Sequence, residues 1–480
     1  MKYNSVVTRI RGELLARITR AFLDGNLLER IDYFPVEMRP RHSEPTRCCI
    51  YKDRAIIRER CIALLGFNIE DDLDELIPLS EYAATALTRQ APEENILTVL
   101  DDACRACTPS RYFVTNVCHA CVDHPCIQHC PKKAISFKNG HQAHIDFDKC
   151  VVCGKCQKVC PFHAIVRIPI PCEEACPVGA ISKDSEGKEH IDFSKCIFCG
   201  KCLNSCPFGA VIQKSQALDV LKALGGKRPV SALLAPSAAG QFQGDIYRLA
   251  GALKTLGFER VVEVALGAEQ TARMEAEELN ERLGRGEKFM TTSCCPAWFQ
   301  AVEKHLHELK PHVSKTPTPM HFTAADEKQR NLQCVTVFIG PCIAKRNEAI
   351  KDAEVDFVLT FEELEAIFEG SGIDPAIQEP ATFDREAGRE GRGFPVAEGV
   401  ASAVMAFADS SEIRCLSING LDKKTMTLLK TYAKKNDAPA ELLEIMSCEG
   451  GCIAGPEIQS GPTISAKRVQ DLLGKSSSST

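Results

Sequence analysis

Apolar residues follow different patterns in successive parts of this chain. Near the start, apolar residues recur at helical spacing in three stretches, residues 6–28, 53–65 and 81–89. Between the first two stretches, residues 32–47 are rich in proline and arginine and are predicted to be extended. We therefore expect residues 1–100 to form a small, mainly helical segment.

The second half of the chain alternates short apolar runs with helical patterns. Runs rich in β-branched residues predict buried strands at residues 230–234, 260–266, 288–292, 335–339, 355–359 and 413–417. Helical patterns fall between them, as over residues 270–283 and 361–368. Such alternation is typical of α/β domains with parallel sheets. An exposed loop is expected over residues 381–394, which are rich in Gly, Arg and Glu, and a disordered tail from Lys475 onward.

Composition narrows the functional classes. A chain of 480 residues is long enough for roughly two to four domains. The net charge of −6 argues against nucleic acid as a partner. No apolar run approaches the roughly 18 residues of a membrane span, so no membrane partner is expected. Charged residues interrupt the first twenty positions, at Arg9, Arg11, Glu13, Arg17 and Arg20 among others, which argues against a signal peptide there and predicts a cytoplasmic protein.

Cysteine is the outlier, with 26 residues. Sixteen lie between Cys104 and Cys206, and none lies between Cys206 and Cys294. In a reducing compartment such numbers indicate metal binding rather than disulfides. Five cysteines have no motif around them. Cys48, Cys49 and Cys61 are expected to be structural, and Cys334 and Cys415 are expected to lie in the core.

Residues 115–167 carry two cysteine runs of the bacterial 4Fe-4S type. Cys150, Cys153, Cys156 and Cys160 are spaced x2, x2 and x3 before a proline, and Cys118, Cys121, Cys126 and Cys130 form a variant with an x4 gap. In two-cluster ferredoxins the last cysteine of each run binds the neighbouring cluster. Isolated zinc sites rarely show this interleaving. The predicted cubes are Cys118, Cys121, Cys126 and Cys160, and Cys150, Cys153, Cys156 and Cys130.

A second ferredoxin-like unit is predicted around the first, from residues 101–114 and 168–212. Its complete run ends at Cys206-Pro207, and its partial run ends at Cys176-Pro177 without an opening pair. That opening is found far upstream, at Cys104-x2-Cys107. The third cube would then be Cys196, Cys199, Cys202 and Cys176, and the fourth Cys104, Cys107, Cys172 and Cys206. The alternative is three accessory cubes, with Cys104 and Cys107 as bystanders.

Three cysteine-containing stretches stand out in the second half. Cys294-Cys295 follows a predicted strand, Gly340-Pro341-Cys342 follows another, and Cys448-Glu449-Gly450-Gly451-Cys452 is expected to follow a helix. Together they supply four thiolates for one cubane, Cys295, Cys342, Cys448 and Cys452. Cys294 is left over, because adjacent side chains at a strand end cannot both point at one atom.

These stretches resemble, in order and spacing, the three signature motifs of the iron-iron (FeFe) hydrogenases. The resemblance covers about residues 228–469, and the N-terminal region is similar to the subgroup called group B. It implies two α/β lobes with an H-cluster between them. This cofactor is a 4Fe-4S cubane joined through a cysteine sulfur to a two-iron azadithiolate unit with CO and cyanide ligands. The implied reaction is 2H⁺ + 2e⁻ ⇌ H2.

The resemblance also implies residue roles. Cys452 would bridge to the two-iron unit, and Cys294 would pass protons to it. Glu275, Glu278, Arg282 and Ser314 match the rest of the family's proton path, although an exposed charged helix face is the alternative for the two glutamates. Lys345, oriented by Glu348, would contact one cyanide. Ala235, Pro236 and Ser237 match the loop that contacts the other. Thr318 stands where many members have glutamine.

The expected architecture is therefore a helical segment over residues 1–100, nested ferredoxin-like α+β units over 101–212, an α/β catalytic domain over 213–470, and a tail over 471–480. The expected partners are ferredoxin or a similar electron carrier, protons and H2, and maturation proteins. A hydrogen sensor and a non-catalytic iron–sulfur electron carrier or assembly protein are the alternatives.

Overall fold

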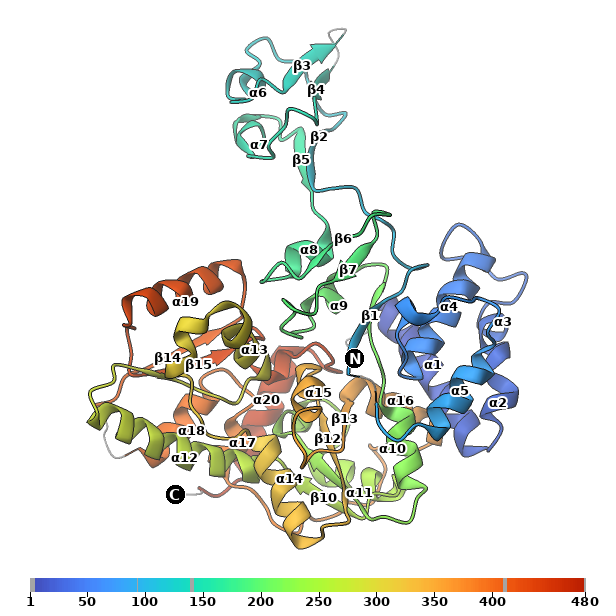
Figure 1. Cartoon of the computed structure of the whole chain (residues 1–480), viewed down its shortest axis with the longest axis vertical. Coiled ribbons are helices and arrows are strands. Elements are labelled where there is room, and N and C mark those ends of the chain that lie inside the picture. The colour runs from blue at the N-terminus through green and yellow to red at the C-terminus, as the bar shows by residue number, and fades with distance from the viewer. Residues whose placement is uncertain (1–4, 93, 139–141, 409–411, 479–480) are drawn as a thin grey trace.

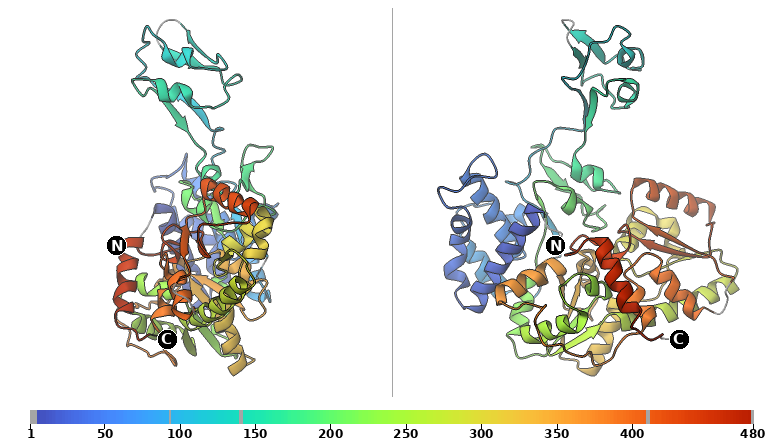
Figure 2. Two further views of the ribbon diagram at one scale, coloured as in Figure 1. Left: turned by 90° about the vertical axis from the view of Figure 1, so that its left-hand side faces the viewer. Right: turned by 180° about the vertical axis from the view of Figure 1, so that it is seen from behind.

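The computed structural model describes residues 5–92, 94–138, 142–408 and 412–478. It consists of N-terminal helices, a small unit that projects from the body, and a large α/β region (Figures 1 and 2). No helix within these ranges is both long and apolar enough to cross a membrane.

The N-terminal segment is helical, as its periodicity predicts. Its α-helices are α1 (Val6–Leu23), α2 (Leu27–Arg30), α3 (Phe34–Met38), α4 (Ile50–Leu64) and α5 (Leu79–Thr88). α1 begins where the Ser5 hydroxyl accepts a hydrogen bond from the Thr8 N–H at 3.1 Å. The prediction of an extended stretch is wrong over residues 34–38, because Pro35 occupies the first turn of α3, where its missing N–H is tolerated.

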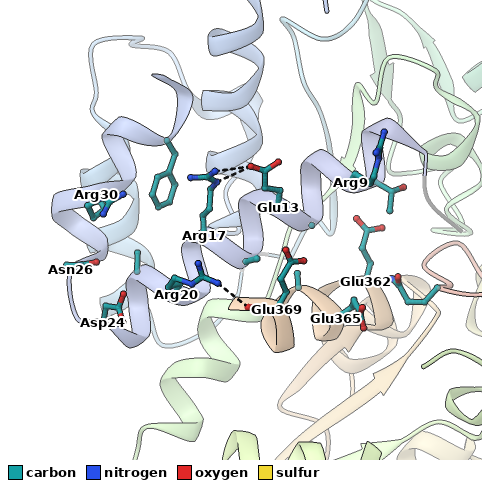
Figure 3. A pocket seen from close by; sticks show the side chains of 17 residues that line it. Arg9, Glu13, Arg17, Arg20, Asp24, Asn26, Arg30, Glu362, Glu365 and Glu369 are labelled. Carbon is teal, nitrogen blue, oxygen red and sulfur yellow. Dashed lines mark hydrogen bonds and ion pairs between the residues drawn. The ribbon is translucent and has the colours of Figure 1, made fainter. Parts of the chain in front are cut away.

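Helix α1 packs along α16 (Phe361–Ser371) of the α/β region, and one continuous apolar core joins the two parts. The buried Arg11 of α1 donates to Glu362 of α16 at 2.7 and 2.8 Å. A groove remains beside this contact, where Arg17 pairs with Glu13 and Arg20 donates to the Glu369 carbonyl (Figure 3). The N-terminal helices are thus part of the same packed body as the α/β region.

The cysteine-rich region is built from short antiparallel strand pairs. The pairs are β1 (Leu97–Val99) with β8 (Val211–Gln213), β2 (Arg111–Val114) with β5 (Ile165–Ile168), β3 (Ile135–Lys138) with β4 (Gln142–Ile145), and β6 (Ile181–Lys183) with β7 (Glu189–Ile191). Short helices lie between them: α6 (Pro125–Gln128), α7 (Lys155–Val159), α8 (Pro171–Ala175) and α9 (Lys201–Ser205). The β2–β5 unit has its own small core and stands away from the rest (Figure 1).

Two parallel sheets form the α/β region, which confirms the predicted α/β content with parallel strands. One sheet has the order β10-β9-β12-β13 and the other β11-β15-β14. The strands are β9 (Val230–Leu234), β10 (Arg260–Glu263), β11 (Met290–Thr291), β12 (Val335–Gly340), β13 (Phe357–Thr360), β14 (Cys415–Asn419) and β15 (Leu442–Met446). β9 and β12 are buried along their whole length, as is usual for parallel strands covered on both faces.

Helices surround these sheets. They are α10 (Ala217–Leu224), α11 (Ile246–Leu256), α12 (Ala265–Gly284), α13 (Pro296–His305), α14 (Pro319–Arg330), α15 (Ala344–Ala349), α16, α17 (Arg389–Gly393), α18 (Gly399–Phe407), α19 (Lys423–Lys435) and α20 (Pro462–Leu473).

Four predictions in the α/β region are wrong. Cys448 follows strand β15 rather than a helix, and Cys415 is exposed at the start of β14 rather than in the core. The predicted loop over residues 381–394 is buried toward its end, where Arg392 of α17 donates to Glu263 at 2.7 Å.

The fourth wrong prediction is the disordered tail. α20 extends to Leu473, and the Ser477 carbonyl accepts a hydrogen bond from the Arg389 N–H at 2.8 Å. Residues 479–480 lie outside the described ranges.

Candidate functional site

A cavity of about 100 Å³ lies where strands of both sheets end. Carboxyl ends of parallel strands are the usual place for sites in α/β folds. Loops after β9, β11, β12 and β15 reach this cavity and contribute Ala235, Pro236, Ser237, Cys294, Cys295, Cys342, Ser447, Cys448 and Cys452. The three cysteine stretches that are far apart in sequence thus meet at one point.

The four thiols predicted for one cubane are mutual neighbours. Burial raises the pKa of Cys448 well above its usual value, and Cys342, Cys452 and Cys295 raise it further. Burial likewise raises the pKa of Cys342 and of Cys452 to about 12, with Cys295 adding to both. Each thiolate therefore disfavours ionisation of the other three thiols, so all four can be ionised together only beside a strong positive charge.

Glycines allow the loops to approach one another closely. Gly450 and Gly451 both have φ of +92°, and a Cβ on Gly451 would lie 2.6 Å from the Pro395 carbonyl oxygen. A Cβ on Gly455 would lie 2.9 Å from atoms of Pro341, which precedes Cys342. Larger residues at these positions would separate the last cysteine loop from its neighbours.

The cavity fits an anionic iron–sulfur group. Thiolates are the ligands that iron–sulfur clusters use. The Ser237 and Ser447 hydroxyls line the cavity, and neither has a hydrogen-bond partner within the described part of the chain. Each is free to donate to a bound group, which would relieve the cost of burying it unpaired.

No three His, Cys, Asp or Glu side chains in the described ranges are placed to hold a single metal ion. This spacing does not conflict with a cubane. Each thiolate around a cubane binds a different iron atom, so the four sulfurs stand farther apart than donors that share one ion.

Lys345 brings a positive charge to the same cavity. Its Nζ donates to Glu348 at 2.7 Å and lies 3.4 Å from the Thr318 hydroxyl, which itself donates to Glu348. Burial alone would lower the pKa of Lys345, but Glu348, Cys342 and Cys294 raise it on balance. Lys345 is therefore held as a cation that faces the cavity.

Cys294 lines the same cavity as the four thiols and also lies near Glu275 of α12. Burial raises its pKa well above the usual value, and Glu275 is the next largest influence. Glu275 is fully buried, and its Oε1 accepts hydrogen bonds from the Ser293 N–H at 2.7 Å and the Ser293 hydroxyl at 2.9 Å. The alternative of an exposed glutamate is wrong for Glu275.

A line of polar groups continues from Glu275 toward the surface. The Ser314 hydroxyl is close enough to lower the pKa of Glu275, but its single proton is donated to Glu278 at 2.7 Å. Glu275 Oε2 is consequently left without a donor among the residues described. Arg282 then donates to the half-buried Glu278 at 2.6 and 2.9 Å. All five residues of the predicted proton path are thus consecutive neighbours.

The sixteen upstream cysteines fall into groups that match the predicted sets. Burial raises the pKa of Cys126, with further contributions from Cys121, Cys118 and Cys160. A second group, Cys130, Cys150, Cys153 and Cys156, lines one cavity of about 20 Å³.

The two outer groups are equally distinct. Burial raises the pKa of Cys202 well above its usual value, and Cys199, Cys196 and Cys176 raise it further. Burial also raises the pKa of Cys107, and Cys104 and Cys206 add to the rise. Cys172 joins this last group, since Cys206 contributes to the elevation of its pKa to about 12, after burial and Glu189. Cys104 and Cys107 are therefore not isolated from the other cysteines.

A repeated backbone contact relates the four groups. The sulfur of each cysteine before a proline accepts a hydrogen bond from the alanine N–H four residues later, at 3.2–3.4 Å, in Cys130, Cys160, Cys176 and Cys206. Such N–H···S bonds to cluster sulfurs help to set reduction potential. The same backbone conformation after the Cys-Pro pair therefore recurs in all four groups.

The group formed by Cys176, Cys196, Cys199 and Cys202 lies beside the cavity of the α/β region. Cys199 lines that cavity and contributes to the raised pKa of Cys448. The positions of the cysteine groups therefore run from the projecting unit, through the outer unit, to the α/β site.

Sequence reasoning missed Glu444 and Ser447. Glu444, in the middle of β15, is fully buried and accepts hydrogen bonds from the Glu398 and Ala401 N–H groups at 2.8 Å. It also influences the pKa of Cys294 and of Cys452. A carboxylate between apolar residues, four positions before Cys448, was the sequence signal for Glu444, whereas Ser447 carried none beyond adjacency to Cys448.

Family models match three parts of the chain. Residues 228–456 match the model described as iron only hydrogenase large subunit, C-terminal domain. Residues 171–210 match a 4Fe-4S dicluster domain, and residues 143–166 match a 4Fe-4S binding domain.

The chain is also similar to curated proteins. The periplasmic iron (Fe) hydrogenase large subunit of Nitratidesulfovibrio vulgaris is 28% identical over 257 residues, which are 43% of this chain and 61% of that protein. Iron hydrogenase 1 of Clostridium pasteurianum is 28% identical over 261 residues, 44% of this chain and 45% of that protein. The nuclear prelamin A recognition factor of Danio rerio is 26% identical over 285 residues, 46% of this chain and 60% of that protein.

In each case the alignment spans less than two thirds of the relative's length. Among solved structures, an FeFe-hydrogenase from Chlamydomonas reinhardtii has 22% identity and a TM-score of 0.46, over 54% of this chain and 88% of that chain.

Proposed function

Because the chain belongs to the iron-iron hydrogenase family, we propose that it interconverts protons, electrons and H2, by the reaction 2H⁺ + 2e⁻ ⇌ H2. The observation that carries this proposal is the pair Cys294 and Cys295 at the end of β11. Cys295 belongs to a group of four thiols, whereas Cys294 faces a buried carboxyl group. One sulfur is thus available for a cluster and the other for proton transfer.

The cofactor proposed for the cavity is an H-cluster. When bound, it supplies the iron atoms at which H2 is formed or split. Cys295, Cys342, Cys448 and Cys452 would hold its cubane, and Cys452 would also bridge to the two-iron unit. The Lys345 ammonium, the Ser237 hydroxyl and the loop at Ala235 and Pro236 would hold the cyanide ligands, because a buried cation and an unpaired donor both stabilise anionic groups.

Protons would travel between the cavity and solvent along Cys294, Glu275, Ser314 and Glu278, with the buried Arg282 paired to Glu278. Burial raises the pKa of Glu275 to about 7, so this carboxyl can both accept and release a proton near neutral pH. The hydroxyl of Ser314 can rotate between the two carboxylates. Arg282 keeps Glu278 ionised, because hydrogen bonding and charge together lower its pKa.

Electrons would pass through four accessory 4Fe-4S clusters, held by the four cysteine groups. Four clusters are preferred over three, because Cys104 and Cys107 neighbour Cys206. The Cys199 group would be the last before the H-cluster. The electron carrier, ferredoxin or a similar protein, would meet the projecting unit, where Cys153 is exposed. Loading of the two-iron unit by maturation proteins and a cytoplasmic location complete the proposal.

Infrared spectroscopy and H2 assays of anaerobically matured protein test this function. We expect CO and cyanide bands, and H2 evolution with a reduced dye. Cys294→Ser should keep those bands and most of the iron but lose nearly all turnover, because a serine hydroxyl releases its proton far less readily than a thiol. Cys415→Ser, at an exposed cysteine outside the site, is the matched control and should keep full activity.

The alternative is a non-catalytic iron–sulfur protein. It is kept because 99 residues of the chain are also 32% identical to a Kluyveromyces lactis protein named cytosolic Fe-S cluster assembly factor. A matured, reduced sample that contains iron but has neither CO nor cyanide bands would favour it and would reject the hydrogenase proposal. Full activity of Cys294→Ser would reject the proton-transfer role alone.

A further inference from the structure

Another concave site lies on the N-terminal side of the molecule, apart from the groove of Figure 3 and outside the proposed catalytic machinery. It has a volume of about 760 Å³ and is formed by the start of α1, the segment before α4, α4 itself and Pro207-Phe208. We call it the arginine pocket, because four arginines line it: Arg39, Arg47, Arg60 and Arg105.

Positive charge dominates the arginine pocket. Asp53 is its only lining carboxylate among the described residues. That carboxylate is buried and already accepts hydrogen bonds from the Thr46 N–H at 2.7 Å and the Thr46 hydroxyl at 3.0 Å, with Arg39 Nε 3.6 Å away. At most one of the four guanidinium charges is balanced from within the pocket.

Arg60 is the member that most needs a partner. It is only 5% exposed, and its Nε has no hydrogen-bond partner in the described part of the chain. Its Nη2 makes one long contact, 3.4 Å, with the Phe208 carbonyl. Burial lowers the pKa of Arg60 to about 10, and Arg11, Arg39 and Arg47 lower it further.

The nearby Glu59 does not balance this charge well. Burial raises the pKa of Glu59 to about 8, so most of it is uncharged at neutral pH. Its two carboxyl oxygens share one donor, the Asp102 N–H, at 3.0 and 3.1 Å. A buried guanidinium without a full set of acceptors costs free energy that a bound anion would recover.

The groove of Figure 3 provides a contrast. Its arginines face carboxylates of α1 and α16, among them Glu13, Glu365 and Glu369, so that its charges are mixed (Figure 3). Among the described residues, the arginine pocket has a single lining carboxylate, that of Asp53. Its walls also include apolar side chains from α1 and α4, namely Val6, Val7, Ile10, Ile56 and Ile57.

We propose that the arginine pocket binds a phosphate monoester, with the phosphate against Arg60 and Arg105 and the organic group against Ile10 and Phe208. Planar guanidinium groups bind phosphate oxygens in pairs, which suits a dianion with three free oxygens. The pocket volume is in the range of small-ligand sites, roughly 300–1,000 Å³, and exceeds what inorganic phosphate alone would fill. Arg47, stacked 5.1 Å from the Phe208 ring centroid, would close the apolar side.

The test uses the full, cluster-containing protein under anaerobic conditions, with phenyl phosphate as the probe in calorimetric titration. We expect saturable binding of phenyl phosphate, at least about tenfold weaker binding of inorganic phosphate, and weakening by added salt. Arg105→Gln and Arg60→Gln should each weaken phenyl phosphate binding at least about tenfold. Arg9→Gln, at an exposed arginine of the Figure 3 groove, is the control and should bind like the unaltered chain.

Arg105 is exposed, so Arg105→Gln keeps the test decisive even where Arg60→Gln fails to fold. No saturable binding of phenyl phosphate to the unaltered protein would overturn the proposal. So would equal affinity in the Arg105→Gln variant. Binding of a polyglutamate peptide without binding of phenyl phosphate would also overturn it, because the pocket would then be a docking surface for an acidic protein.

Discussion

Replacing Glu275 with glutamine should lower the proposed activity without lowering the stability of the fold. Glutamine keeps the size of the side chain and an oxygen that can accept from the Ser293 N–H and hydroxyl. It removes the ability to carry a proton in exchange with Cys294. We expect H2 evolution to fall by about 10²- to 10⁴-fold, the usual contribution of one general acid–base group.

The same substitution should stabilise the fold at high pH. Burial raises the pKa of Glu275 from 4.5 to about 7, so ionisation costs the folded state about 3 kcal/mol above pH 7. Stability from this group is therefore complete below pH 4.5 and is lost as the pH rises through 7. Glutamine never ionises, so the variant should be more stable than the unaltered chain by up to about 3 kcal/mol at pH 8, and equally stable near pH 4.5.

The assay compares H2 evolution at pH 7 and anaerobic denaturation at pH 5 and pH 8 for both proteins. Glu277→Gln, an exposed glutamate on the same helix, is the control and should change neither property. A Glu275→Gln variant with full activity would refute the proton path. A variant less stable than the unaltered chain at pH 8 would refute the assignment of Glu275 as a carboxyl group whose ionisation is costly.

Three other substitutions test the packing and the cluster count. Cys172→Ser should lower the iron content by about four atoms per chain if the fourth accessory cluster exists, and unchanged iron would argue for three. Gly451→Ala should lower the free energy of unfolding by roughly 1–3 kcal/mol and should also reduce the iron bound by the cubane, because φ is +92° and the added Cβ would meet the Pro395 carbonyl oxygen. A normal iron content would contradict this reasoning. Arg11→Leu should destabilise the chain by about 3–5 kcal/mol in denaturation, because Glu362 would lose its buried partner, and an unchanged midpoint would count against the ion pair.

The sequence predicted elements well where local preference and burial agree. β9 and β12 match their predicted spans almost residue for residue, because short runs of β-branched and apolar residues leave little choice. β15 was missed because Leu442–Met446 consists mostly of good helix formers with Glu444 in the middle. Only tertiary structure supplies the N–H groups of residues 398 and 401 that make a buried glutamate acceptable in a strand.

The sequence likewise predicted those features of the site that depend on local spacing, but not those that depend on tertiary contacts. Cysteine spacing was informative because loop geometry limits which sulfurs can share a cube, and the groups in the structure match it. Helical periodicity places Glu275, but not Glu277, on the apolar face of α12 with Ala272 and Leu279. It does not show that a charged residue on that face is buried, because the Ser293 donors that make this burial acceptable come from a distant loop. The arginine pocket also lay beyond sequence patterns, since its arginines come from separate segments and meet only after α4 packs near Phe208.

The strands β2 and β5 give the projecting unit a single narrow attachment. Arg111 and Ile168 are paired across these antiparallel strands, so the chain leaves and re-enters the body at nearly the same place. Evolution or a protein engineer could delete or exchange the intervening residues as one cassette without rerouting the remaining polypeptide. The number of cysteine groups in the projecting unit, and how far that unit extends, could then change independently of the α/β site.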